Sequence, residues 1–136
     1  MAELVYKDPY LLVNSVDLSD YVRQVTINYG AEILDKTAGT TNSKEKIAGL
    51  KDWSLSIELN QDFATSAVDD TLFDLVGAAE FAVVIKPNGS VTGSSNPSFS
   101  GNGVLASYPP LGASVGQLIT TSITIEGSGD LSRATT

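Results

Sequence analysis

Cysteine and histidine are both absent from the 136 residues of this sequence, and each absence removes a class of chemistry. Without cysteine the chain can form neither a disulfide framework nor a thiolate metal site, and it lacks the most nucleophilic side chain. Without histidine it lacks the usual general base at neutral pH. We therefore predict no catalytic, cofactor-binding or metal-binding residues, and we do not expect an enzyme.

Carboxylates gather in one place, at Asp69, Asp70 and Asp74. Their spacing matches no calcium-binding loop, whereas acidic residues are favourable at the positively polarised start of a helix. A solvated helix face is the stronger interpretation of this cluster, and a cation site is the alternative.

Basic residues and long apolar runs are also scarce. Eight Lys and Arg residues stand against sixteen Asp and Glu residues, and the formal net charge of −8 argues against a protein that grips nucleic-acid phosphates. No apolar stretch reaches the roughly 18 residues that a membrane-spanning helix needs, and the N-terminus lacks the pattern of a signal peptide. We expect one domain over residues 1–136, with no membrane partner.

The sequence does contain alternation of apolar and polar residues, which is the pattern of half-buried strands. It runs through residues 22–29, 53–60 and 119–126. Residues 81–85 are apolar almost throughout, as in a strand covered on both faces. Residues 68–76 repeat apolar side chains at helical spacing. The predicted fold is mainly β: two packed antiparallel sheets, as a sandwich or barrel, with one flanking α-helix and a long loop between strands.

Trp53 permits two interpretations. An exposed tryptophan can stack on a sugar or a base. Its place in the alternation with Leu55, Ile57 and Leu59 instead predicts that it belongs to the core.

Residues 34–50 have no sustained period and hold Lys36, Lys44 and Lys46 around Glu45. A loop of this length inside one domain is usually functional or disordered. We predict that it faces solvent or a partner, because no phosphate-binding pattern surrounds its lysines.

Two further segments are predicted to be irregular. Residues 88–103 are rich in Gly, Ser and Asn, which is typical of a flexible loop. Residues 127–136 are polar and are predicted to form a C-terminal arm.

The polar members of the three alternating segments are short and neutral or acidic. They include no Lys or Arg, although an ordinary solvent-exposed sheet face mixes in some of both. A face without cations also fits a wall along which a polyanion slides without sticking. The set comprises Gln24, Thr26, Asn28, Ser54, Ser56, Glu58, Asn60, Thr120, Ser122, Thr124 and Glu126.

Several short motifs, in this order along nearly the whole chain, resemble the major tail proteins, or tail tube proteins, of long-tailed, non-contractile bacteriophages. None of them is chemically diagnostic alone. They are Val16–Val22 (VDLSDYV), Ile47–Leu55 (IAGLKDWSL), Gln61–Phe63, the 68–76 helix, Phe81–Pro87, Asn96–Pro97, Gly112–Gly116 and Gly129–Arg133.

The resemblance implies a structural protein of the virion tail, assembled in the host cytoplasm, whose rings of six subunits stack into a tube. DNA would pass through the lumen without specific binding, and the other partners would be the tape-measure protein, the tail terminator and the distal tail or baseplate proteins. It implies an inter-ring contact at Lys36, Lys44, Glu45 and Lys46, and the cation-free face then becomes a lumen wall that includes Ser54, Ser56, Glu58, Asn60, Ser122 and Thr124. The alternative is an immunoglobulin-like module that decorates a capsid or binds carbohydrate.

Overall fold

The computed structural model describes residues 3–40 and 42–136; residues 1, 2 and 41, which fall within the predicted domain and the predicted loop, lie outside that description. The strands are β1 (Tyr10–Val13), β2 (Val16–Asp17), β3 (Val22–Asp35), β4 (Lys46–Asn60), β5 (Phe81–Lys86), β6 (Ser98–Leu105) and β7 (Thr120–Ala134). The helical segments are η1 (Ser19–Tyr21), α1 (Val68–Leu72) and η2 (Phe73–Leu75).

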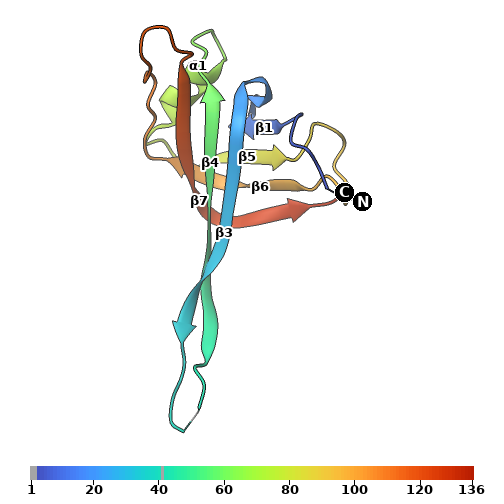
Figure 1. Ribbon diagram of the computed structural model, residues 1–136, viewed down its shortest axis with the longest axis vertical. Helices are drawn as coiled ribbons and strands as arrows, with labels where there is room; N and C mark the ends of the chain where they lie inside the picture. Colours follow the sequence, from blue (N-terminus) through green and yellow to red (C-terminus); the bar gives the residue numbers. More distant parts are fainter. Residues whose placement is uncertain (1–2, 41) are drawn as a thin grey trace.

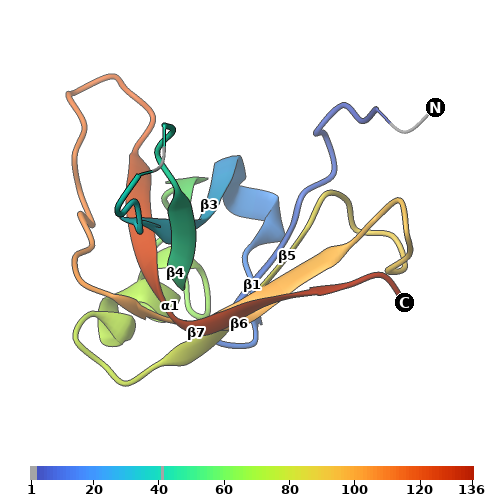
Figure 2. The same ribbon diagram turned by 90° about the horizontal axis from the view of Figure 1, so that it is seen from below.

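Within these residues the seven strands form one antiparallel sheet, in the order β2-β1-β5-β6-β7-β4-β3. β7 serves two partners: from Thr120 to Glu126 it pairs with β4, and from Ile125 to Ala134 it pairs with β6. Figure 2 shows the sheet bent along β7, so that the β3–β4 half stands across the β1–β5–β6 half. The mainly-β class with one α-helix is confirmed, and the two expected sheets are two halves of one continuous sheet.

Glycine makes the bend possible, because Trp53 lies directly against the backbone of β6 and β7 there. A Cβ atom at Gly127 would overlap the indole ring, and one at Gly101 would lie 2.7 Å from its Cζ2 atom. Larger residues at these positions would push the ring off the sheet. Trp53 is only 3% exposed, so its predicted place in the core is confirmed.

The core fills the inside of the bend. Apolar members of the predicted alternations, such as Leu59 and Ile125, are fully buried there. The predicted helix is present as α1 followed by η2, and Leu72 is among the residues it adds to the core. Gly77, with a φ of +72°, follows in the left-handed conformation that glycine adopts without strain, and this ends the helical segment.

β3 and β4 continue together beyond the body as a two-stranded ribbon, which we call the arm (residues 30–52). Figure 1 shows it projecting along the longest axis of the molecule, away from the other strands. The pairing reaches Asp35 and Lys46, so only residues 36–45 connect the two strands. Residues 34–50, predicted as a loop without regular structure, are therefore strand at both ends.

A β-bulge explains why the sequence does not show the β4 part of the arm. The register shifts between Ala31 and Ile33, so that Gly49 and Leu50 both stand opposite Glu32. A bulge interrupts the strict alternation by which a strand is recognised.

The two other segments predicted to be irregular are also partly strand. Residues 98–103 belong to β6 and residues 127–134 to β7. The remaining loop, residues 88–97, is organised by Asn96, which is 6% exposed and donates a hydrogen bond from its side-chain amide to the carbonyl of Ser90 at 2.9 Å. Among the described residues, no helix is both long and apolar enough to cross a membrane.

The contact between Trp53 and the bend predicts a specific sensitivity to substitution. Gly127→Ala places a methyl group where the indole lies, and overpacking of this kind costs about 1 to 3 kcal/mol. Gly112→Ala is the matched control, because nothing lies within 4 Å of a Cβ atom there. Denaturant unfolding measures both. Equal stability of the two variants would contradict the proposed packing.

Candidate functional site

The predicted polar side chains come together on one face of the β3–β4–β7 half. The strand registers align them in rows across the three strands, and directly paired residues share a face. A shallow depression of this face is lined by residues of two of the rows. The rows are Gln24–Glu58–Ser122, Thr26–Ser56–Thr124 and Asn28–Ser54–Glu126, and Asn60 pairs with Thr120 at the end of the face. We call this surface the polar face.

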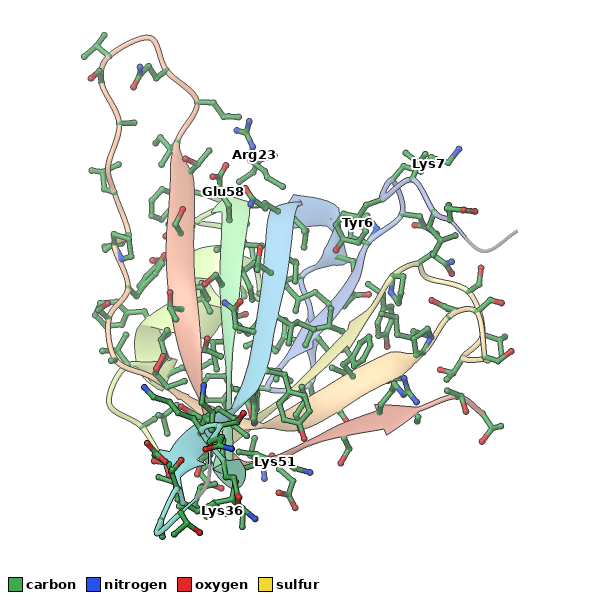
Figure 3. All side chains as sticks on the ribbon, turned by 60° about the horizontal axis from the view of Figure 1, so that its bottom comes forward. Tyr6, Lys7, Arg23, Lys36, Lys51 and Glu58 are labelled. Atoms are coloured by element: carbon green, nitrogen blue, oxygen red, sulfur yellow. The ribbon has the colours of Figure 1, made fainter. Side chains whose placement is uncertain are left out.

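The polar face is not free of cations, contrary to the sequence-based expectation. A register shift between Val22 and Gln24 inserts Arg23 as an extra residue in β3. Its Nε atom lies 3.4 Å from Oε1 of Glu58, and Figure 3 shows the two side chains meeting at the end of the sheet away from the arm. Arg23 thus places a positive charge beside the carboxylate of Glu58, and both side chains stay partly exposed.

The charged residues predicted for an inter-ring contact lie together at the far end of the arm. The backbone N–H of Lys36 donates to the carbonyl of Glu45 at 3.0 Å, and Lys46 is the last residue paired with β3. These residues and Lys44 are exposed. The structure therefore separates the two predicted site groups: one occupies the arm and the other the polar face.

Hydrogen bonds close the end of the arm. Asp35 Oδ1 accepts from the backbone N–H of Thr37 at 2.8 Å, and Oγ1 of Thr37 accepts from the backbone N–H of Glu45 at 2.7 Å. Hydrogen bonds from Thr37 hold the pKa of Asp35 below its ordinary value. The hydrogen bond from the Thr37 side chain has the larger effect, and the one from its backbone N–H has the smaller. These bonds tie residues 35–37 to Glu45 at the base of the connection.

The arm also exposes large apolar residues that the sequence analysis did not single out. Their exposed fractions are 62% for Ile33, 50% for Leu34, 52% for Ile47 and 77% for Leu50. The available signal in the sequence is the presence of these apolar residues in a segment that is predicted to face solvent or a partner.

Two of the three carboxylates of the acidic cluster, those of Asp69 and Asp70, make hydrogen bonds within the fold. Asp69 Oδ1 accepts a hydrogen bond from the Tyr108 hydroxyl at 2.8 Å, and Asp70 Oδ2 accepts one from the backbone N–H of Ser66 at 2.9 Å. Burial raises the pKa of Tyr108 to about 12, and the carboxylate of Asp69 acts in the same direction. Among the described residues, no three His, Cys, Asp or Glu side chains gather as a metal ion requires.

The structure offers one of the two features that a small-molecule site would use. Trp53 is buried, so it offers no stacking platform for a sugar. An open apolar groove does run between the two halves of the sheet, past Val25, Ile27, Phe99 and Leu131. Binding sites add a few placed polar groups that orient the ligand, and the polar groups of this lining are the side chains of two tyrosines and of Lys86.

No protein-family model matches the sequence, and no curated protein matches it. Solved structures do match the fold. A chain from the virion of a native gene transfer agent particle aligns over 97% of this chain and 99% of its own length, with a TM-score of 0.75 and 16% identity. A chain from the tail of an empty gene transfer agent particle with C6 symmetry aligns over 84% and 82%, with a TM-score of 0.66 and 16% identity.

A chain from the sheath/tube terminator of an extracellular contractile injection system aligns over 98% of both lengths, with a TM-score of 0.72 and 12% identity. At such low identities the likeness establishes the fold alone. The tail-tube resemblance read from the sequence is confirmed at that level, and the fold is shared between gene transfer agent particles and contractile injection systems.

The hydrogen bonds at the end of the arm predict a pH response. The hydrogen bonds from Thr37 stabilise the ionised carboxylate of Asp35, and for this reason its pKa is lowered. This stabilisation is fully present above the ordinary pKa of an aspartate, about 3.9. It is lost as the pH falls through the lowered pKa. The chemical shift of the Thr37 amide should change only in that acidic range, and Asp35→Asn should abolish the change. A midpoint at or above the ordinary pKa of an aspartate would rule out the hydrogen bonds described for Asp35.

Proposed function

We propose that this chain is a structural subunit that assembles with its own copies into rings of six, and that the rings stack into the tail tube of a long, non-contractile phage or phage-like particle. The observation that carries the proposal is the arm, an exposed ribbon with apolar and charged residues on a body whose fold matches chains of tail-bearing particles. In a monomer such a projection exposes apolar side chains to water without burying them, whereas in an assembly it can bury them against another subunit.

The polar face supports a role as the wall of a DNA conduit. Its side chains are short and uncharged or acidic, and Glu58 holds Arg23, the cation that the structure adds to it. A surface of this kind makes few attractive contacts with phosphates, so a duplex can move along it. In the proposed tube this face lines the lumen.

The arm supports axial stacking. In the proposed tube its lysines lie against carboxylates of a copy in the adjacent ring. Contacts between unlike ends of identical subunits continue without closing, which produces a filament. The free edge of β3 is a hazard in an isolated sheet and becomes a joint between copies within the ring.

The remaining partners follow from the place of a tube in a tail. The proposed tube encloses a tape-measure protein that sets its length, ends at a tail terminator and starts from distal tail or baseplate proteins. In this proposal the chain is assembled in the host cytoplasm and resides in the virion tail.

Removing the arm tests the stacking role. Residues 32–50 are replaced by Asn-Gly, a two-residue turn that joins the paired residues Ala31 and Lys51. The body keeps its core, so we expect a folded protein that forms no tubes by negative-stain microscopy, while the native chain forms them. The proposal fails if the armless variant forms tubes of native length.

Adding positive charge to the polar face tests the lumen role. Ser56→Lys and Thr124→Lys, which stand on directly paired positions, should leave assembly intact and slow DNA ejection several-fold, because each ring then attracts phosphates. Val91→Lys is the control, because Val91 is 89% exposed and lies outside this face. Native ejection rates from tubes that carry both lysines would show that the face lies elsewhere.

A further inference from the structure

The bulge collects three large apolar side chains on one face of the arm. Leu34 and Ile47 are directly paired and so share a face. Leu50 stands opposite Glu32, two residues before Leu34, and therefore lies on the same face. Ile47 and Leu50 are an odd number of residues apart, so only the extra residue of the bulge, Gly49, lets them point the same way.

We call Leu34, Ile47 and Leu50 the apolar strip. Each of them is at least half exposed, so the described part of the chain does not cover it. An isolated two-stranded ribbon is only marginally stable in water, and an uncovered apolar face adds to that cost. The opposite face of the arm mixes apolar and charged residues. Its pairs are Ala31–Lys51, Ile33–Ala48 and Asp35–Lys46.

A second exposed apolar surface lies at the other end of the molecule. Residues 106–119, which we call the upper loop, join β6 to β7. The loop exposes 67% of Leu111, 107% of Val115 and 66% of Leu118. Figure 1 shows the loop at the end of the long axis opposite the arm.

The upper loop is held in place at its base. Gln61 Nε2 donates to the carbonyl of Pro110 at 2.8 Å, and the Thr121 hydroxyl donates to the carbonyl of Pro109 at 2.9 Å. Its apolar residues are therefore presented from an anchored segment.

Neither of these two surfaces carries a net charge. The arm contains four of the eight Lys and Arg residues and four of the sixteen Asp and Glu residues, so its net charge is zero and the rest of the chain bears the whole charge of −8. Residues 87–125, which include the upper loop, contain no charged residue. Two acidic copies repel each other over most of their surfaces. The neutral arm and the uncharged loop can meet without that penalty.

We propose that the apolar strip of one copy packs on the upper loop of the next copy along the tube axis. The inference rests on the proposed stacking and adds an apolar contact to the charged contact proposed there. In a head-to-tail stack, whatever projects from one end of a subunit meets the opposite end of its neighbour. The two apolar surfaces at the two ends are then buried against each other, and the mixed face of the arm stays outside the contact.

The test uses two variants of the full chain. The strip variant carries Leu34→Ser and Ile47→Ser, and the loop variant carries Leu111→Asp and Val115→Asp. All four side chains are exposed, so both variants should fold and should unfold at the same denaturant concentration as the native chain. Each variant alone should lose tube formation in negative stain while the native chain forms tubes.

Mixing the two variants separates this contact from others. The intact strip of the loop variant can bind the intact loop of the strip variant, and the resulting pair, whether of single copies or of rings, offers no further functional end along the tube axis. The mixture should therefore form complexes of twice the mass of either variant, measured by light scattering, and no tubes.

Controls on exposed residues outside the contact are Ile33→Ser, on the mixed face of the arm, and Val91→Asp, in another uncharged loop. Both should form tubes. The inference is overturned if the loop variant forms normal tubes, if Ile33→Ser abolishes them as fully as the strip variant does, or if the mixture gains no mass. Should the native chain itself form no tubes, the proposed function falls, and this contact falls with it.

Discussion

The hydrogen-bonded pairing of β3 with β4 is the constraint on which the rest of the structure depends. Inside the body it fixes which side chains of the β3–β4–β7 half face the core and which form the polar face. Beyond Trp53 the same pairing continues without a core beneath it and becomes the arm. One pair of strands therefore links the core, the proposed lumen wall and the proposed axial contact. Trp53 packed on Gly127 anchors that pair where it leaves the body.

Two bulges in this pairing decide the chemistry of the surfaces. The first adds Arg23 to the polar face beside Glu58, and the second brings Ile47 and Leu50 onto one face of the arm. Each inserts a single residue, and each changes which face a side chain occupies. The polar face stays nearly free of unpaired positive charge, whereas the arm gains an apolar surface.

The sequence predicts those parts of the fold in which burial imposes a regular period. The alternation from Trp53 to Leu59 identifies a strand and its buried face, and the rows of polar residues follow from the same parity. The bulges break that parity, so neither the position of Arg23 nor the strand at residues 46–50 could be predicted from it. The upper loop carries no periodic signal, and its place opposite the arm depends on the path of the whole chain.

A cryo-EM reconstruction of the purified chain at high concentration tests the central claim most directly. The account predicts a hollow tube with C6 symmetry, in which Ser56 and Thr124 face the channel and each arm reaches into the adjacent ring. Particles that remain single chains under varied salt and concentration would contradict it. A tube whose polar face points outward would contradict it equally.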